Sequence, residues 1–190
     1  METKILSFKR LSLERENLLA RKILLSVTLS AVTGLLAGIR IPLPFTPVPL
    51  TGQVLGVLLA GLFLEGSFAG LSQVFYLLFG LGGIPWFAGW SSLSFLTFFA
   101  NPSSGYIVGF IPAAFLVGKL EHCGSRMNLL RHVITLLAGV MVLYSFGAVH
   151  FAAVMHTGFQ KTLVLAVYPF IFFDFLKALL AASFINVFRK

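Results

Sequence analysis

The feature that most constrains the fold is a succession of long apolar segments separated by short polar ones. Each segment approaches the roughly 20 residues that an α-helix needs to cross the hydrocarbon core of a bilayer. The chain has 58% hydrophobic and only 11% charged residues, whereas roughly 25% of a soluble domain is charged. The sequence therefore predicts an all-α, polytopic membrane protein with six transmembrane helices. The six segments cover residues 23–39, 48–64, 67–81, 104–120, 128–150 and 162–188.

The basic residues predict how these helices are oriented. If the N-terminus is cytoplasmic, the outer loops contain only Arg40 and Lys161, an asymmetry that follows the positive-inside rule. We therefore expect both termini in the cytoplasm. We also expect a short interfacial helix over the charged residues 1–22, followed by a six-helix transmembrane domain over residues 23–190. The basic residues expected on the cytoplasmic side are Lys4, Lys9, Arg10, Arg15, Arg21, Lys22, Lys119, Arg126, Arg131, Arg189 and Lys190.

Two segments outside the predicted helices are rich in proline or glycine. Residues 84–100 contain Pro85 and Gly89, and a crossing helix here would move the basic residues after position 118 to the outside. We therefore expect an ordered outer loop or a re-entrant segment. Residues 41–49 contain four prolines, which prevent a helix and favour a rigid, extended connection that could act as a lid.

Several function classes are excluded by the same sequence. The basic residues border apolar runs and do not cluster with aromatic residues, which argues against nucleic-acid binding. Cys123, the single cysteine, has only His122 beside it, a poor basis for a metal site. Residues 117–120 lack the second glycine and the hydroxyl of a phosphate-binding loop, so we expect no ATP hydrolysis. His150 and His156 lie on different helix faces, and we interpret them as interfacial polar residues rather than catalytic ones.

An acid and a base lie three residues apart inside the last apolar segment. Asp174 and Lys177 would occupy neighbouring positions on one helix face. A charge at this depth costs roughly 2.5–3.5 kcal/mol when it faces lipid, so the pair must face protein or water. Desolvation of a buried ion pair can exceed its Coulombic gain, which makes a ligand-binding role the favoured interpretation over a structural ion pair.

The first apolar segment carries a stripe of small residues, one every four positions. This small-residue stripe lets another helix approach closely, and it fits both packing inside the protein and contact with a separate subunit. Its members are Ser26, Ser30, Gly34 and Gly38.

Several further blocks occur in a characteristic order between about residues 26 and 183. They cover residues 41–49, 51–53, 57–61, 76–78, 83–89, 105–110, 113–116 and 174–178. In this order they resemble the BioY family, the biotin-specific substrate-binding components (S components) of energy-coupling factor (ECF) transporters. The resemblance implies six helices, cytoplasmic termini, a prokaryotic plasma membrane and high-affinity capture of biotin from outside, with no enzymatic activity.

The resemblance also implies partners. Because no ATPase motif lies in this chain, uptake would be energised by an ECF transmembrane scaffold subunit and by ATP-binding subunits. The small-residue stripe is the face expected to dock on the scaffold. Membrane lipid surrounds the helices, no cofactor is expected, and biotin is the transported ligand.

Biotin carries a ureido group, an apolar bicyclic ring system and a carboxylate, and each needs a matching group in the site. We expect Asp174 to accept hydrogen bonds from the ureido N–H groups. We expect Lys177 to donate to a biotin oxygen, either the ureido carbonyl or the carboxylate. Further polar candidates are Gln53, Tyr106, Asn101 and Ser91 or Ser92, and the expected ring walls are Trp86, Phe87 and Trp90.

Three alternatives remain open from the sequence. The chain could be an S component for another vitamin, such as thiamine or riboflavin, which a panel of ligands would distinguish. It could be a structural membrane subunit in which Asp174 and Lys177 form an assembly ion pair, so that mutation would disrupt a complex rather than ligand binding. An intramembrane enzyme that uses Asp174 with His150 or His156 would need these groups within hydrogen-bond reach.

Overall fold

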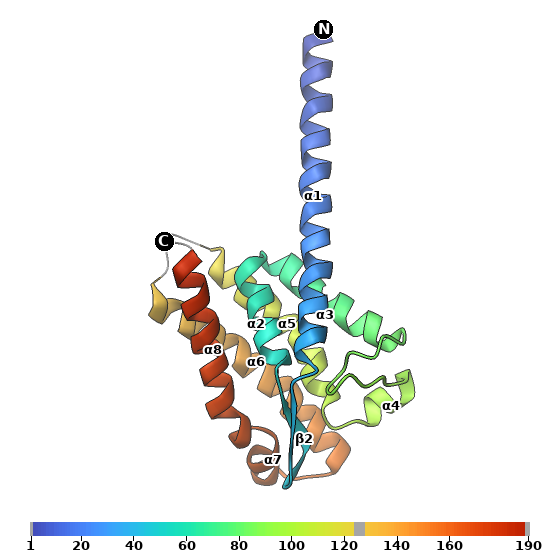
Figure 1. Ribbon diagram of the computed structural model, residues 1–190, viewed down its shortest axis with the longest axis vertical. Coiled ribbons are helices and arrows are strands. Elements are labelled where there is room, and N and C mark those ends of the chain that lie inside the picture. The colour runs from blue at the N-terminus through green and yellow to red at the C-terminus, as the bar shows by residue number, and fades with distance from the viewer. Residues whose placement is uncertain (1, 124–127, 189–190) are drawn as a thin grey trace.

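The structure, a computed structural model, describes residues 2–123 and 128–188 (Figure 1). It is predominantly helical, as predicted, with one short sheet. The helices are α1 (Glu2–Leu36), α2 (Gln53–Phe63), α3 (Gly66–Leu81), α4 (Phe95–Ala100), α5 (Ser104–Glu121), α6 (Leu129–Met155), α7 (Phe159–Ala166) and α8 (Tyr168–Phe188), and the strands are β1 (Arg40–Leu43) and β2 (Thr46–Thr51).

The helices differ in their capacity to cross a bilayer. Within the described residues, four stretches are long and apolar enough to do so, and they belong to α1, α5, α6 and α8. Helices α2 and α3 have 11 and 16 residues, which corresponds to about 16 and 24 Å at 1.5 Å per residue. The apolar segments of the sequence thus become helices of unequal length. The four crossing stretches are Arg15–Leu36, Ser104–Glu121, Leu129–Met155 and Tyr168–Ile185.

The N-terminal segment is continuous with the first predicted span. Residues 2–22, expected as a separate short helix, form the first part of the 35-residue helix α1. In Figure 1 this part projects beyond the other helices, while the end of α8 lies on the same side of the molecule. Lys119 and Arg131 lie at the facing ends of α5 and α6. Three of the basic residues expected on the cytoplasmic side lie outside the described residues, namely Arg126, Arg189 and Lys190.

The proline-rich segment forms a hairpin, which corrects the all-α expectation. Strands β1 and β2 pair antiparallel, with Arg40 opposite Thr51 and Leu43 opposite Thr46. The predicted extended conformation is confirmed, but the pairing was not anticipated. Proline lacks the N–H that a central strand needs. A two-stranded sheet has only edge strands, so Pro47 and Pro49 are tolerated in β2.

Residues 84–100 form an ordered loop that ends in the short helix α4, and no helix crosses the bundle here. Ser94 caps α4 by accepting a hydrogen bond from the Thr97 amide. An isolated bridge pairs Phe87 with Ser91. Trp90, inside this turn, has a φ of 56°, in the left-handed region that non-glycine residues rarely adopt.

The last apolar segment is broken between α7 and α8, whereas its sequence predicts one continuous helix. Val167 ends α7 with a φ of −128°, and Pro169 occupies the first turn of α8, where its missing N–H is not needed. The Phe170 amide donates to the Val167 carbonyl oxygen at 3.0 Å. In a continuous helix that amide would instead bond to the carbonyl oxygen of Ala166.

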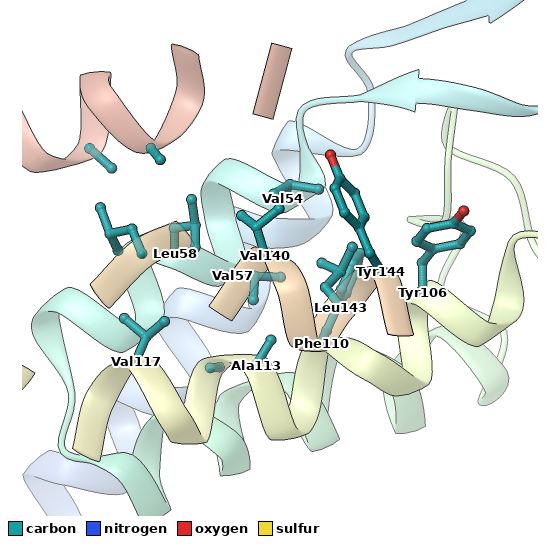
Figure 2. Packing of buried hydrophobic residues seen from close by; sticks show 14 of the residues in the cluster. Val54, Val57, Leu58, Tyr106, Phe110, Ala113, Val117, Val140, Leu143 and Tyr144 are labelled. Atoms are coloured by element: carbon teal, nitrogen blue, oxygen red, sulfur yellow. The ribbon is translucent and has the colours of Figure 1, made fainter. Parts of the chain in front are cut away.

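The core lies between α2, α5 and α6. Figure 2 shows aliphatic side chains from these three helices meeting, with Tyr106 and Tyr144 at one end of the packed group. This end is the one nearest the hairpin and α7, which lie together opposite the N-terminus in Figure 1. The labelled residues are Val54, Val57 and Leu58 of α2, Tyr106, Phe110, Ala113 and Val117 of α5, and Val140, Leu143 and Tyr144 of α6.

Candidate ligand-binding site

A cavity of about 50 Å³ lies beneath the hairpin, between α2, α5, α6 and α8. We refer to it as the Asp174 cavity. It contains four of the sequence-predicted site residues, which come from three different helices. Its lining comprises Val48, Pro49, Leu50, Thr51, Gln53, Val54, Ala88, Ser103, Tyr106, Ile107, Phe110, Leu143, Tyr144, Phe170, Asp174 and Lys177.

Asp174 is the most constrained polar group in this cavity. The residue is only 2% exposed, yet both carboxyl oxygens have a hydrogen-bond donor. Lys177 Nζ donates to Oδ1 at 2.7 Å, and the Tyr144 hydroxyl donates to Oδ2 at 2.7 Å. A buried carboxylate needs such partners because desolvation strongly disfavours an isolated charge. The predicted proximity of Asp174 and Lys177 is therefore confirmed, and the pair faces protein rather than lipid.

Tyr144 was not among the predicted site residues. It is 5% exposed and lies on α6, next to Leu143 and one turn from Val140, which belong to the same buried cluster. A tyrosine in an apolar helix also suits a membrane interface, so its position in the sequence did not distinguish the two roles. The sequence did offer one indication of this role: a buried Asp174 needs a second hydrogen-bond donor besides Lys177.

The second tyrosine in the cavity, Tyr106, forms a hydrogen bond at the point where the helix is interrupted between α7 and α8. The Tyr106 hydroxyl donates a hydrogen bond to the carbonyl oxygen of Ala166. That carbonyl is available because the Phe170 amide bonds to Val167. Tyr106 therefore joins α5 to the point where the last apolar segment changes direction, directly beside the cavity.

Gln53 reaches the cavity from the first turn of α2 and belongs to a buried polar chain. Its Nε2 donates to the Tyr76 hydroxyl, which donates to the Trp86 carbonyl oxygen at 3.0 Å. The Trp86 indole N–H returns a hydrogen bond to the Tyr76 carbonyl oxygen at 2.9 Å. This chain fixes the position of Gln53 and connects the cavity wall to the loop that contains Trp86.

Three further predicted residues, Trp86, Phe87 and Asn101, lie outside the cavity lining. Trp86 stacks on Tyr76, and Phe87 is 1% exposed among Tyr76 and Phe98. Asn101 accepts from the Ser103 amide at 2.9 Å and, through its backbone oxygen, contacts His150. Ala88, next to Phe87, supplies the contact of this loop with the cavity.

Trp90 lies farther away, at the small-residue stripe. It is 62% exposed, and its indole packs so closely on Gly38 that a Cβ there would lie 2.5 Å from it. A Cβ on Gly34 would likewise lie 2.5 Å from Trp86. The loop containing both tryptophans thus covers the end of α1.

The small-residue stripe packs inside the protein, which is one of the two arrangements that the sequence allowed, and its contact with a separate subunit stays a prediction. Ser26 and Ser30 are fully buried, and the Ser26 hydroxyl reaches the Phe68 carbonyl oxygen of α3 at 3.0 Å. Together with Gly34 and Gly38, these positions bring α1 close to α3 and to the tryptophan loop. A separate subunit could contact them only if α1 moved away from α3.

Comparison with known proteins supports a common family. The sequence model of the BioY family matches residues 5–190. A biotin transporter BioY of Rhizobium etli is 34% identical over 149 residues, which cover 75% of this chain and 78% of the relative. A probable biotin transporter BioY of Pyrococcus horikoshii is 37% identical over 145 residues, with 74% and 80% covered.

A solved structure agrees with the fold described above. The crystal structure of the S component for biotin from an ECF-type ABC transporter superimposes with a TM-score of 0.80. The match has 26% sequence identity and covers 91% of this chain and 93% of that one. The arrangement of helices around the Asp174 cavity is therefore that of a known membrane S component.

Proposed function

Because the chain belongs to the BioY family, we propose that it is the high-affinity biotin-binding subunit of a transporter that takes up biotin. It is a transport component and not an enzyme, in line with its relatives and its structural neighbour. Asp174 supports the assignment most directly: it is a buried carboxylate with two donors, in the wall of a largely apolar cavity. This combination of a few placed polar groups with apolar walls is typical of small-molecule sites.

The ureido group of biotin fits the Asp174–Lys177 pair. It presents N–H donors and a carbonyl acceptor side by side, and the pair presents an acceptor and a donor 2.7 Å apart. A carboxylate has about four acceptor positions, so Asp174 can accept from a ureido N–H while it keeps Tyr144 and Lys177. In this arrangement Lys177 donates to the ureido carbonyl. Val54, Ile107 and Phe110 then surround the bicyclic ring.

The carboxylate of biotin needs a cation nearer the opening, and Arg40 is the candidate. Arg40 is exposed and lies opposite Thr51, which lines the cavity. Its side chain packs on Gly89, the neighbour of the lining residue Ala88. Arg40 thus lies beside two parts of the cavity lining, and we propose that the flexible acyl chain of biotin ends there. A guanidinium can bind a carboxylate in bidentate fashion.

The hairpin is proposed to act as the lid over this site. Val48, Leu50 and Thr51 of β2 form part of the wall. The cavity of about 50 Å³ is smaller than the roughly 150 Å³ that benzene occupies in an engineered apolar cavity. A bicyclic ligand therefore requires the lining to move, and β2 contributes Val48 and Leu50 to both the lining and the core.

We further propose the membrane arrangement that the transport role requires. Helices α1, α2, α3, α5, α6 and α8 would cross the membrane, the two shorter ones with locally thinned lipid or flanking polar residues. Both termini would face the cytoplasm of a prokaryotic cell, with the hairpin and the Asp174 cavity toward the outside. An ECF scaffold subunit and ATP-binding subunits would supply the energy.

Calorimetric titration of the detergent-purified protein, stripped of endogenous ligand, tests this function. We expect tight one-to-one binding of biotin and no binding of thiamine or riboflavin. In Asp174→Asn and Lys177→Met, loss of one charged partner should weaken biotin binding about ten- to hundredfold, corresponding to about 1–3 kcal/mol. Lys161→Met, at an exposed position on α7, is the control and should bind normally.

Two outcomes would contradict the proposal in different ways. Binding of thiamine or riboflavin instead of biotin would retain an S component but change the vitamin. Wild-type affinity in both site variants, with loss of a larger assembly, would indicate that Asp174 and Lys177 form a structural ion pair.

A further inference from the structure

A second groove lies at the end of the bundle opposite the hairpin, between α1, the α2–α3 turn and the end of α5. We call it the Glu65 groove. It consists of two hollows of about 200 and 310 Å³ that share Glu65 and His122. The first is lined by Leu18, Arg21, Lys22, Leu25, Phe63, Leu64, Glu65, Phe68 and His122, and the second by Glu65, Gly66, Ser67, Phe115, Gly118, Lys119 and His122.

Glu65, which lines both hollows, forms an ion pair with Lys22. Lys22 Nζ lies 2.9 Å from both carboxyl oxygens of Glu65 and 5.2 Å from the ring centroid of Phe68. The hydrogen bond and the charge of Lys22 lower the pKa of Glu65, so the carboxyl is ionised at neutral pH. The pair has no net charge, and Glu65 lies where the two hollows meet.

Two further basic residues give the groove a positive charge. Arg21 lines the first hollow, Lys119 lines the second, and both side chains are exposed. Neither residue forms an ion pair with any part of the chain that the structure describes. The groove therefore presents two uncompensated cations, one on each side of the Lys22–Glu65 pair.

The walls below these charges are apolar and accessible. Leu18 is 54% exposed, Leu25 42% and Phe63 45%. A soluble anion would make no use of this surface, whereas an acyl chain would cover it. Basic pockets between membrane helices, with apolar surface running into the bilayer, suit the head groups and chains of anionic lipids.

We propose that the Glu65 groove binds an anionic phospholipid. The phosphate is held by Arg21 and Lys119 on either side of the Lys22–Glu65 pair, and one acyl chain lies along Leu25 and Phe63. Two cations match an anionic head group better than a zwitterionic one. By contacting α1, the α2–α3 turn and α5 together, the lipid stabilises this end of the bundle.

The proposal is tested on the full-length protein in detergent, by thermal unfolding with added lipid. We expect cardiolipin or phosphatidylglycerol to raise the Tm by several degrees, because a ligand that binds only the folded state stabilises it. Phosphatidylcholine should give a much smaller shift, and so should inorganic phosphate at the same phosphate concentration. Arg21→Gln/Lys119→Gln should lose at least half of the shift, whereas Lys161→Gln, at the hairpin end, should keep it.

Native mass spectrometry supplies a direct second readout. The wild type and Lys161→Gln should retain one or more anionic lipids that the double variant loses. Equal stabilisation by phosphatidylcholine, or by inorganic phosphate, would overturn the proposal, as would unchanged lipid retention in the double variant. A double variant that keeps its lipid but no longer co-purifies with a scaffold subunit would instead identify the groove as a protein interface.

Lipid binding at the Glu65 groove can be tested independently of the proposed transport function. The Glu65 groove and the Asp174 cavity share no lining residue. Biotin binding should therefore be unchanged in Arg21→Gln/Lys119→Gln. A lipid effect without biotin binding, or the reverse, would separate the two proposals.

Discussion

The Tyr144 hydroxyl donates a 2.7 Å hydrogen bond to Oδ2 of Asp174, joining α6 to α8 inside the cavity. Lys177 holds the other oxygen, Oδ1, from one turn farther along α8. The carboxylate is therefore fixed in one orientation by groups from two helices. A carboxylate that is fixed before the ligand arrives loses less conformational freedom on binding.

Replacement of Tyr144 by phenylalanine tests this relationship. The variant keeps the ring but removes the donor, so Asp174 loses one of its two partners while it stays buried. We expect biotin affinity to fall about tenfold or more, since an unmade buried hydrogen bond costs about 1–3 kcal/mol. Tyr168→Phe, at a position that is 57% exposed, is the matched control. Equal affinities of the two variants in calorimetry would show that Tyr144 does not position the carboxylate.

The role proposed for Arg40 predicts a ligand-dependent effect. Arg40→Gln should weaken the binding of biotin by about tenfold, corresponding to about 1.4 kcal/mol for a charged contact. Biotin methyl ester, which has no carboxylate charge, should bind the wild type and the variant equally. A parallel loss for acid and ester would assign Arg40 to the conformation of the hairpin rather than to the carboxylate.

The hairpin predicts the rate at which ligand leaves. Replacing residues 42–47 by a glycine–serine linker of equal length removes the proline constraint and the Leu43–Thr46 pair. We expect biotin to dissociate at least tenfold faster, with a smaller change in the association rate. Pro44→Ala changes only the exposed turn and is the control. An unchanged dissociation rate in the linker variant, measured by chasing labelled biotin, would exclude the lid role.

The internal packing of the small-residue stripe predicts a stability defect. A larger side chain at Gly34 must displace Trp86, and overpacking of this kind costs about 1–3 kcal/mol. Gly34→Leu should therefore lower the thermal unfolding temperature of the isolated protein. Leu35→Ala, at a neighbouring position that is 68% exposed, should leave it almost unchanged. A stable Gly34→Leu variant that fails only to bind the scaffold would support the docking interpretation instead.

The sequence allowed part of the site to be predicted because charge is rare in an apolar chain. Asp174 and Lys177 were identifiable on that ground alone, and the structure places them together. Gln53 and Tyr106 came from the family resemblance and also lie in the cavity. Tyr144 was missed because a tyrosine in a membrane helix has several ordinary roles, and its contact with Asp174 joins residues 30 positions apart.

Backbone pairing and packing partners were harder to predict. The prolines at 41–49 indicated extended backbone, but a hairpin also depends on which residues pair across it. The spacing of Ser26, Ser30, Gly34 and Gly38 indicated a close contact without identifying the partner, which proved to be α3 and the tryptophan loop. The break at Val167 was overlooked because the residues on both sides of it are apolar, and only Pro169 marked it.

The break between α7 and α8 illustrates how a membrane protein can acquire a polar group in a binding site. Each polar side chain must be carried into a low-dielectric medium during insertion, whereas every residue already brings a backbone carbonyl. By ending α7 at Ala166, the chain presents one such carbonyl to Tyr106 without adding any polar side chain. Pro169, in the first turn of α8, marks the position at which the backbone contributes this polar group to the site. Relatives with identical lining side chains could therefore differ in ligand preference wherever one of them restores a continuous helix.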